Sequence, residues 1–421
     1  MKSKYLPRIA DSILEEKLQA FGAIYITGPK WCGKTSTAER HAKSALFMQN
    51  PDTIESNLRA ADTKPSLLLA GEKPRLLDEW QVAPVLWDAV RFAVDRSEED
   101  GLFILTGSAA IKDGQTKHTG TGRIARMPMR TMTLFESGES SGHVSLKSLF
   151  DEDLDIECIS TLSIEKLAFA LVRGGWPKAI GRQESIALIQ VAEYVDATIN
   201  TDASAIDGVT RTPARMRSLM RSLARNISTG ASITTIRNDM RYEEKSLSED
   251  TIISYLNTLN KLYVVEDLPS WNPSVRSKTS IRTSPVRHFV DPSIATAVLR
   301  LNSEALLKDF KTFGLLFESL CVRDLRVYAE ANDGSVYHYR DAYGLEADAV
   351  VVLKDGRWGA IEVKMGNTEI EKGAANLLKL RETIDTEKMN QPSFLMVLTA
   401  SDYAYKRKDG VLVTPIGCLK N

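Results

Sequence analysis

The chain is poor in the residue types that mark secreted, metal-stapled and membrane-spanning proteins. Among 421 residues it has four cysteines, which form no Cys-x-x-Cys pair, and five histidines without metal-ligand spacing. This scarcity argues against a disulfide framework and a zinc module, so we expect reduced thiols. No apolar run approaches the length of a membrane span, and the first residues lead into no signal-peptide core. We therefore expect a cytoplasmic protein without a membrane partner.

An excess of charge of one sign is also missing. The sequence has 54 basic and 55 acidic residues, a formal net charge of −1. The chain as a whole is therefore not a polycation, and any contact with nucleic acid has to come from a local basic face. A chain of this length exceeds one ordinary core, so we expect two or three domains.

The strongest motif in the sequence is Gly28–Thr35, which matches G-x-x-x-x-G-K-[ST] at every fixed position. An apolar strand is predicted before it and a helix after it. In such a phosphate loop the backbone N–H groups and the helix N-terminus surround phosphate, Lys34 reaches the β- and γ-phosphates, and the Thr35 hydroxyl binds Mg²⁺. The sequence thus predicts ATP and Mg²⁺ as cofactors. The predicted cofactor contacts are Gly28, Pro29, Lys30, Trp31, Cys32, Gly33, Lys34, Thr35 and Ser36.

Acidic and polar residues follow two later strands. Asp78 and Glu79 end the apolar strand predicted over 75–79, and Ser108 follows the strand over 102–106. We assign Asp78 to the metal, Glu79 to polarising the attacking water and Ser108 to sensing the γ-phosphate. The alternative for the Asp-Glu pair is a solvated strand end.

Arg123 lies in the glycine-containing segment 120–126, after a polar stretch at 112–119. An arginine on such a loop can neutralise charge that develops on the γ-phosphate, particularly when a neighbouring subunit supplies it. The alternative is an ordinary surface arginine.

The order of predicted elements divides the chain into parts of different character. Up to about residue 140, strands over 23–27, 67–70, 75–79 and 102–106 alternate with helices over 36–43 and 84–94, which indicates a mostly parallel sheet. The stretch 136–160 is rich in Ser, Gly, Glu and Asp and is interpreted as a linker or lid.

The middle of the chain is predicted to be mostly helical. Thr212 and Pro213 supply an N-cap and a first helical position, and the apolar stripe over 216–227 has the helical period. The further elements predicted here are helices over 233–240 and 248–262, a wing-like strand over 263–268 and a loop over 272–284.

The last third has the order α-β-β-β-α-β after a strand at 286–290 and a short helix capped by Asp291. Its predicted elements are a helix over 313–329, strands over 336–340, 346–353 and 359–364, a helix over 371–384, and strands over 394–399 and 411–415.

Four residues of this last third form a candidate catalytic group, which we call the carboxylate cluster: Glu318, Asp348, Glu362 and Lys364. Glu362 and Lys364 share one strand face, and Asp348 can face them from the adjacent strand. We predict that the carboxylates, with Glu318 contributed by a helix, bind Mg²⁺ and that Lys364 activates water or stabilises charge. A solvated Glu-x-Lys strand is the alternative, and Glu346 competes with Asp348 as the ligand.

A basic face is predicted on the helix over 212–227. Arg217, Arg221 and Arg225, here called the arginine face, recur every four residues and therefore share one side of that helix. Binding of nucleic acid through them would depend steeply on salt. The alternatives are a solvated face, pairing with acids of the N-terminal domain, or a protein–protein module.

The chain resembles a widespread family of predicted prokaryotic AAA-type ATPases. The segments that carry the resemblance are Gly28–Thr35, Leu77–Gln81, Leu105–Ser108, Gly122–Ile124 and Met129–Glu136. The resemblance implies an ATPase joined to a winged-helix-like region and to a C-terminal domain similar to PD-(D/E)xK nucleases, with Glu318, Asp348, Glu362 and Lys364 as its core.

The resulting prediction is an α/β protein in three parts. These are a P-loop AAA-type ATPase domain at 1–140, a helical winged-helix-like region at 161–275 and a restriction-endonuclease-like α/β domain at 285–421. The expected function is Mg²⁺-dependent ATP binding and hydrolysis, with a nuclease-like domain that binds or cleaves nucleic acid, DNA being the expected partner. The alternative is a nucleotide-gated regulatory or DNA-binding ATPase whose nuclease fold is not catalytic. A homo-oligomer would let one subunit supply Arg123 to the next.

Overall fold

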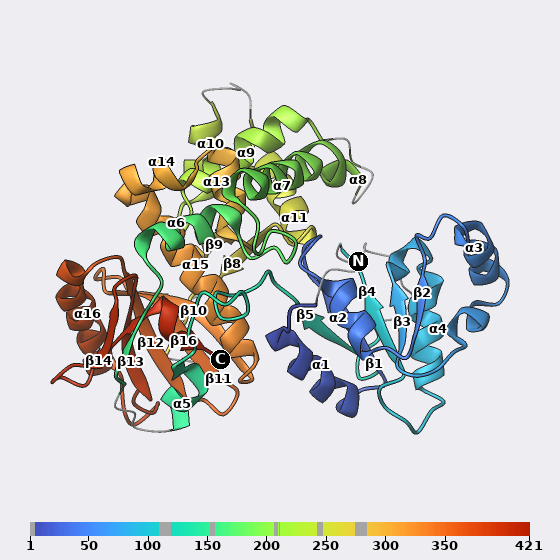
Figure 1. The fold of residues 1–421 in the computed structure, drawn as a ribbon, viewed down its shortest axis with the longest axis horizontal. Helices are drawn as coiled ribbons and strands as arrows, with labels where there is room; N and C mark the ends of the chain where they lie inside the picture. Colours follow the sequence, from blue (N-terminus) through green and yellow to red (C-terminus); the bar gives the residue numbers. More distant parts are fainter. Residues whose placement is uncertain are drawn as a thin grey trace. The chain divides into compact units, whose positions relative to one another are not determined.

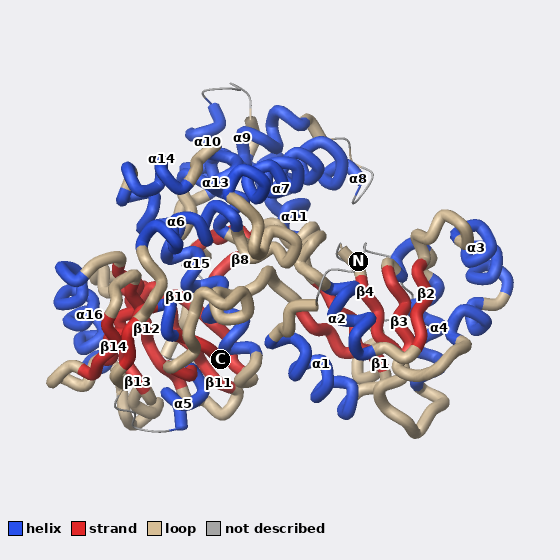
Figure 2. Tube along the Cα trace, viewed as in Figure 1, coloured by secondary structure: helices blue, strands red, loops and turns tan. Residues whose placement is uncertain are grey.

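A parallel sheet of five strands, in the order β2-β3-β4-β1-β5, organises the N-terminal part of the chain (Figures 1 and 2). The computed structural model describes residues 5–108, 119–151, 156–205, 209, 211–241, 247–273 and 284–421. Its contacts divide the chain into two compact units. The first comprises Met1–Thr131 with the short pieces Ser204–Val209 and Lys261–Tyr263, and the second the remainder from Met132 onward.

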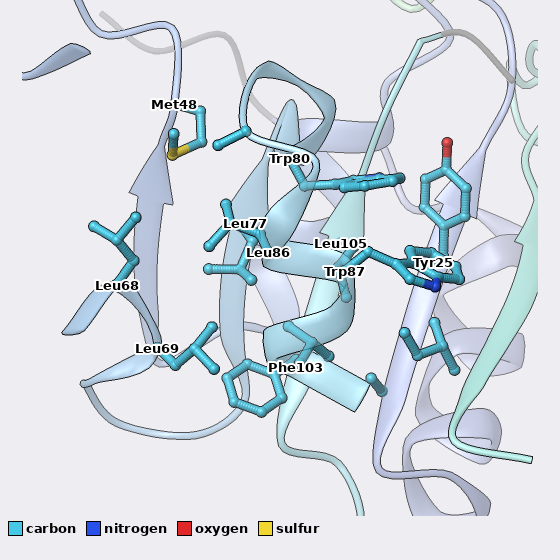
Figure 3. Packing of buried hydrophobic residues seen from close by; sticks show 14 of the residues in the cluster. Tyr25, Met48, Leu68, Leu69, Leu77, Trp80, Leu86, Trp87, Phe103 and Leu105 are labelled. Atoms are coloured by element: carbon cyan, nitrogen blue, oxygen red, sulfur yellow. The ribbon is translucent and has the colours of Figure 1, made fainter. Parts of the chain in front are cut away.

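Helices cover both faces of the first sheet because its strands are apolar on both sides. In β1 (Ala23–Thr27), Ile24 and Ile26 pack toward α1 and α2, and Tyr25 packs on the opposite face with α4 and the 3₁₀ helix η1 (Figure 3). The α/β class with a parallel sheet is thereby confirmed. The elements of this unit are α1 (Ile9–Ala20), β1, α2 (Lys34–His41), β2 (Ser44–Phe47), α3 (Ile54–Thr63), η1 (Pro65–Leu69), β3 (Arg75–Asp78), η2 (Trp80–Val82), α4 (Val85–Val94), β4 (Phe103–Thr106) and β5 (Ile124–Pro128).

The strand predicted over 67–70 is wrong. Residues 67–69 belong to the 3₁₀ helix Pro65–Leu69, Ala70 follows that helix, and the strand beside β3 is Ser44–Phe47. A short apolar run buries its side chains equally well in either form, so periodicity does not separate the two. Pro65 at the first position of η1 favours the turn, and Leu68 and Leu69 still reach the core.

The second unit is built around a mixed sheet of seven strands in the order β10-β11-β12-β13-β15-β14-β7. Pairing is parallel across β12, β13 and β15 and antiparallel elsewhere. Two pairs of strands, β16 with β6 and β8 with β9, lie outside this sheet. The strands of the second unit are β6 (Val144–Ser145), β7 (Cys158–Ile159), β8 (Val265–Leu268), β9 (Val286–Phe289), β10 (Gly334–Arg340), β11 (Glu346–Leu353), β12 (Trp358–Lys364), β13 (Phe394–Thr399), β14 (Tyr403–Lys406), β15 (Leu412–Pro415) and β16 (Leu419–Lys420).

Helices cover this sheet and form a layer beside it (Figure 1). The helix α15 packs on β10, β11 and β12, and α16 packs on β11, β12 and β13. The helices from Leu146 onward are α5 (Leu146–Asp151), α6 (Ile164–Arg173), α7 (Glu184–Ala197), the π-helix η3 (Thr198–Asp202), α8 (Ala203–Ala205), α9 (Pro213–Arg225), α10 (Ile233–Arg241), α11 (Glu249–Lys261), α13 (Pro292–Leu299), α14 (Ser303–Lys308), α15 (Phe310–Glu330), the 3₁₀ turns η4 (Asn367–Glu369) and η5 (Ile416–Cys418), and α16 (Ile370–Thr383).

The interpretation of 136–160 as a linker or lid is wrong for the described residues. The segment adds β6 beside β16 and β7 beside β14, so both of its strands pair with the end of the chain. Short polar segments of this kind have no apolar periodicity of their own, and their pairing depends on partners more than 240 residues away (for example Val144 with Leu419).

The strand predicted as a wing pairs with a strand that sequence analysis assigned to the C-terminal domain. Residues Val265–Leu268 pair antiparallel with Val286–Phe289, after the helices α9, α10 and α11. In the part of the chain that the structure describes, no helix is long and apolar enough to span a membrane.

Candidate functional site

The phosphate loop joins β1 to α2 in the conformation that its glycines allow. Gly33, the residue before α2, is left-handed with φ 105°, and Gly28 has φ 147°. A Cβ at Gly28 would lie 2.1 Å from the carbonyl oxygen of Met129, so only glycine fits there. The N-terminus of α2 follows directly, which adds backbone N–H groups and a partial positive charge to the loop.

Lys34 lies inside this loop. Its side chain is buried, and its Nζ donates hydrogen bonds to the carbonyl oxygens of Gly28 at 2.9 Å and Pro29 at 2.7 Å. The ammonium is therefore held by neutral carbonyl groups of the loop itself. An anionic phosphate oxygen would be a stronger partner than either carbonyl, because the attraction between two opposite charges is added to the hydrogen bond.

Thr35, Asp78 and Thr106 meet at the carboxyl ends of the neighbouring strands β3 and β4. The Thr35 hydroxyl donates to Asp78 Oδ1 at 2.7 Å, and the Thr106 hydroxyl donates to the same oxygen at 2.6 Å. Pairing of Asp78 with Thr106 in the sheet brings them together. A hydroxyl and a carboxylate are hard oxygen donors, so Thr35 and Asp78 fit Mg²⁺.

Glu79 follows Asp78 in a left-handed conformation, with φ 52°. Strain of this kind in a residue other than glycine concentrates at functional sites. The Glu79 carboxylate accepts hydrogen bonds from the Gln81 amide and from the Ser108 hydroxyl, the latter at 3.3 Å. Ser108 therefore lies beside the acid, and its role as a sensor of the γ-phosphate stays a prediction. Gln81 lies within the segment Leu77–Gln81 that carries the family resemblance, but sequence analysis assigned it no role.

The residue that follows Glu79 belongs to a group of buried aromatic side chains. Trp80, the next residue, is fully buried against Tyr25, with ring centroids 5.7 Å apart, and against Trp87 at 5.0 Å (Figure 3). Both tryptophans therefore belong to the buried core of the first unit. Their rigidity fixes the backbone that carries Glu79, although Trp80 Nε1 has no hydrogen-bond partner among the described residues.

The remaining residues of the phosphate loop divide by exposure. Lys30, Trp31 and Ser36 are exposed, with half of the Trp31 surface open. Cys32 is buried, and its Sγ donates to the carbonyl oxygen of Met129 at 3.5 Å, which agrees with a packing role.

Arg8 is a residue near the loop that sequence analysis did not select. Its buried guanidinium donates hydrogen bonds to the carbonyl oxygen of Cys32 at 2.7 Å and to that of Arg130 at 2.8 Å. It thereby ties the phosphate loop to the segment after β5. No local motif marks such a residue, because its partners lie 24 and 122 residues away.

Arg123 lies at the other end of the first sheet from the phosphate loop. It precedes β5, and its carbonyl oxygen accepts from the N–H of Ala23, where β1 begins. Its half-exposed guanidinium pairs with Asp95 at 2.6 Å. Within its own chain it therefore does not approach the loop, and a role in a neighbouring subunit stays a prediction.

Three members of the carboxylate cluster, Asp348, Glu362 and Lys364, are in contact. Asp348 on β11 accepts from the backbone N–H of Val363 at 2.7 Å and from Lys364 Nζ at 3.2 Å. Lys364 also lies 2.5 Å from Glu362 Oε2, and Asn376 of α16 donates to the other oxygen of Glu362 at 3.2 Å. Asn376 was not foreseen.

The charges in this cluster are incompletely compensated. Burial, and then the charge of Asp348, raises the pKa of Glu318 on α15 well above its usual value. The same two causes, in the same order, raise the pKa of Glu362 to about 7. For Lys364, the two carboxylates outweigh burial and raise the pKa of the ammonium. Three converging carboxylates with one lysine thus favour a further cation or a bound proton.

The carboxylate cluster has donor groups of the kind that bind Mg²⁺, but their arrangement does not match a metal site. Three carboxylates are a suitable donor set. Among the described residues, however, no group of three or more His, Cys, Asp or Glu side chains is arranged to hold a metal ion. Lys364 lies between Asp348 and Glu362, where a metal ion would bind. The metal assignment of Glu318, Asp348 and Glu362 therefore stays a prediction. Glu346, at the start of β11, is exposed, and Asp348 alone of the two contacts Lys364.

The arginine face is exposed along α9. Arg217, Arg221 and Arg225 all lie on the surface, and Arg217 donates to Asp196 of α7 at 2.9 Å. Arg217 and Arg221 line a cavity, whereas Arg225 lies outside it. Arg217 thus pairs with an acid, as one alternative proposed, but this acid belongs to the helices of the second unit and not to the N-terminal domain.

A turn whose role the sequence did not reveal has a clear structural function. After Arg173, the turn at Gly174–Trp176 docks on the N-cap of α13, where the N–H of Gly175 donates to Asp291 at 2.9 Å. A Cβ at Gly175 would lie 2.1 Å from the carbonyl oxygen of Met132, which explains the glycine. Asp291 in turn pairs with the buried Arg323.

Comparison with known proteins agrees with the N-terminal site. Residues 20–137 match a family model described as an AAA domain. The predicted likeness of this region to AAA-type ATPases is thereby confirmed. Residues 164–305 and 313–419 match two models, DUF8612 and DUF4143, each described as a domain of unknown function. These descriptions name no activity, and none of them identifies a nuclease or a winged helix.

Individual proteins add little on function. The uncharacterized proteins Mb2031c of Mycobacterium bovis and Rv2008c of Mycobacterium tuberculosis are each 24% identical over 371 residues, 86% of this chain and 74% of theirs. Among solved structures, the Walker-type ATPase PABY2304 of Pyrococcus abyssi matches at 14% identity with a TM-score of 0.41, over 71% of this chain and 97% of that protein. A RuvB mutant of Thermotoga maritima matches at 14% identity with a TM-score of 0.27, over 62% and 87%. Scores this low give no basis for transferring a function.

Proposed function

We propose that the first unit binds ATP with Mg²⁺ and hydrolyses it. The observation that carries this proposal is the meeting of Lys34, Thr35 and Asp78 around one loop. The buried ammonium of Lys34 donates to two carbonyl oxygens, and the Thr35 hydroxyl is bonded to a carboxylate at the end of a strand. The match to the AAA-domain family over 20–137 supports it.

Each residue has a task that its position suits. Backbone N–H groups of the phosphate loop bind the phosphate oxygens, and Lys34 exchanges its two carbonyl partners for the β- and γ-phosphates. Thr35 and Asp78 would hold Mg²⁺, which when bound draws charge from the phosphate oxygens. Glu79 orients the attacking water and accepts its proton, and Ser108 and Gln81 set the position of that carboxylate.

An arginine from a neighbouring subunit completes this proposal. Arg123 would leave its surface ion pair with Asp95, which contributes little stability, and neutralise charge on the γ-phosphate of the adjacent copy in a homo-oligomer. Arg123→Ala should then lower ATP turnover in the oligomer while nucleotide affinity stays unchanged. Equal turnover by the variant and the wild type would leave Arg123 as a surface residue.

The test of the hydrolysis step is Glu79→Gln. We expect Mg²⁺-ATP affinity to be kept and turnover to fall by about 10²-fold or more, because a positioned general base contributes 10²–10⁴-fold. The matched control is Glu98→Gln, on an exposed loop of the same unit, which should leave turnover unchanged. Full turnover by Glu79→Gln would remove this residue from the mechanism.

A second candidate function concerns the carboxylate cluster. We propose that the C-terminal domain is nuclease-like and acts on phosphodiester bonds of nucleic acid, DNA first, with Mg²⁺ held by Asp348 and Glu362 and assisted by Glu318. The convergence of these acids with Lys364 at the carboxyl end of β12 supports this. In the alternative, the C-terminal domain binds nucleic acid without cleaving it, and ATP binding switches the conformation of the protein.

Cleavage of plasmid and single-stranded DNA separates the two. Activity that needs Mg²⁺, stops with EDTA and is lost in both Asp348→Ala and Lys364→Ala supports catalysis. The control Asp355→Ala removes an exposed carboxylate of the same domain and should cleave normally. Cleavage that survives both cluster variants would come from another protein, and absence of cleavage on every substrate would favour the binding module.

Nucleic-acid binding is proposed for the middle region, whose order of three helices followed by the β8–β9 hairpin suits a winged helix. The arginine face would contact phosphates. Affinity should then fall with salt, and fall further when Arg217, Arg221 and Arg225 are all replaced by alanine. Equal affinity of that variant and the wild type would reject this face.

A further inference from the structure

The helical layer of the second unit contains a cavity of about 620 Å³ between α7, α9 and the end of α13. Helix α13 packs on both α7 and α9 (Figure 1). The volume lies within the range of 300–1,000 Å³ that is typical of small-molecule sites. The cavity is confined to this layer and shares no residue with the phosphate loop or the carboxylate cluster.

Arginine side chains and apolar side chains together line this cavity. Arg217 and Arg221 of α9 and Arg300 at the end of α13 line it, opposed by one acid, Asp196 of α7. Three arginines against one aspartate leave a formal excess of two positive charges. The apolar part of the lining, which we call the apolar floor, includes Val195, Ile199, Ala297, Val298 and Leu299.

Two local features of the backbone shape the cavity. Ile199 belongs to the π-helix Thr198–Asp202, and an inserted π-turn in a helix is frequent at functional sites. Arg300 has a left-handed conformation, with φ 57°, where α13 ends. Its exposed guanidinium has no side-chain hydrogen bond or ion pair to another residue in the described ranges. A charged donor thus borders the cavity without a protein acceptor.

We infer that this cavity binds a nucleoside phosphate, whose phosphate contacts Arg221 and Arg300 and whose planar base lies on the apolar floor. Guanidinium groups match phosphate oxygens in geometry as well as charge. Two sources carry this chemistry: a free mononucleotide, or the phosphorylated end of a nucleic-acid strand. The inference goes beyond the proposed ATPase and nuclease functions, because it needs neither hydrolysis nor cleavage.

Arg182 supplies a control. It lies in the turn just before α7, is exposed and does not line the cavity. A ligand that is only attracted to exposed arginines of the helical layer would depend on Arg182 and Arg221 alike. A ligand inside the cavity would depend on Arg221 and Arg300.

The experiment is calorimetric titration of the full chain with AMP, with 5′-phosphorylated tetrathymidylate and with its 5′-hydroxyl form. We expect Arg221→Gln and Arg300→Gln to raise the dissociation constant of the phosphorylated probe at least tenfold, and Arg182→Gln to change it less than twofold. Since all three side chains are exposed, the variants should keep the thermal midpoint of the wild type.

The probes distinguish the two sources. Binding of AMP at the cavity identifies a free nucleotide, and binding of the 5′-phosphorylated oligonucleotide without AMP identifies a strand end. No heat with either phosphorylated probe would overturn the inference, as would equal weakening by all three variants or equal affinity for the 5′-hydroxyl form. The proposed ATPase can fail without affecting these results, because the variants measure affinity in the helical layer and not turnover.

Discussion

The buried guanidinium of Arg323 offers the sharpest test of how the second unit is held together. It pairs with Asp291 at 3.0 Å and with Asp324 at 2.8 Å, and the exposed fractions are 3% for the arginine and 0% for both acids. Asp291 also holds the N–H of Gly175, and Asp324 holds the N–H of Leu134, each at 2.9 Å. The perturbation is Arg323→Met, which keeps the bulk of the side chain and removes its charge.

The expected cost follows from what is left behind. Two fully buried carboxylates would lose their cation, and breaking a buried ion pair by removing one partner costs about 3–5 kcal/mol. Burial already raises the pKa of Asp324 to about 6, with Arg323 opposing it. Without Arg323, that pKa rises further. Because the folded state then binds the proton more tightly than the unfolded state, the destabilisation should shrink as the pH falls from 7 to 5.

Scanning calorimetry of the full chain measures this directly. A loss of 3–5 kcal/mol corresponds to a fall of about 10 °C in the midpoint of the second unit. The control is Arg357→Met, which also removes an arginine with two acidic partners, Asp151 at 2.8 Å and Asp355 at 2.7 Å, but is 40% exposed. It should cost less than about 1 kcal/mol. Equal midpoints of the two variants would refute the argument from burial.

Three further predictions follow from other sites. Gly28→Ala places a Cβ 2.1 Å from the carbonyl oxygen of Met129 and should weaken nucleotide binding at least tenfold in a titration. The control Gly230→Ala, whose Cβ would have no atom within 4 Å, should leave the nucleotide affinity unchanged. Equal affinities of the two variants would contradict this geometry. Burial lowers the pKa of His338 to about 4, so the neutral, buried imidazole favours the folded state above pH 6.5, and this contribution is lost as the pH falls. Between pH 7.5 and 5.5, the free energy of unfolding in urea should fall by about 1 kcal/mol more for wild type than for His338→Gln. The control His143→Gln, at an exposed histidine, should behave like wild type. Lys364→Met removes the cation beside Glu362, whose pKa of about 7 should then rise in a carboxyl NMR titration, and an unchanged value would argue against their pairing.

The parts of the site that could be predicted from the sequence are those whose chemistry is local. Gly28–Thr35 needs its glycines and Lys34 at fixed spacing because one loop surrounds the phosphates. The alternation of Glu362 and Lys364 on one strand similarly fixes that they share a face. Strand ends such as Asp78 were identifiable because an acid after an apolar run marks the edge of a parallel sheet.

The parts that escaped prediction depend on distant partners. Arg8 acts on a carbonyl 122 residues away, and the turn at Gly174–Trp176 serves an N-cap, Asp291, 116 residues downstream of Gly175. The strand β7 exists because the edge of β14 accepts it. Tertiary contacts decide such features, and a short polar or apolar run does not encode them by itself.

The most direct measurement is ATP turnover by the full chain with Mg²⁺, compared between wild type and Lys34→Ala, with Lys43→Ala, an exposed lysine that follows α2, as control. We expect turnover by wild type, turnover by Lys43→Ala of the same order, and none by Lys34→Ala, since the loop then loses its buried ammonium. Unchanged turnover in Lys34→Ala, or no turnover by wild type, would contradict the account.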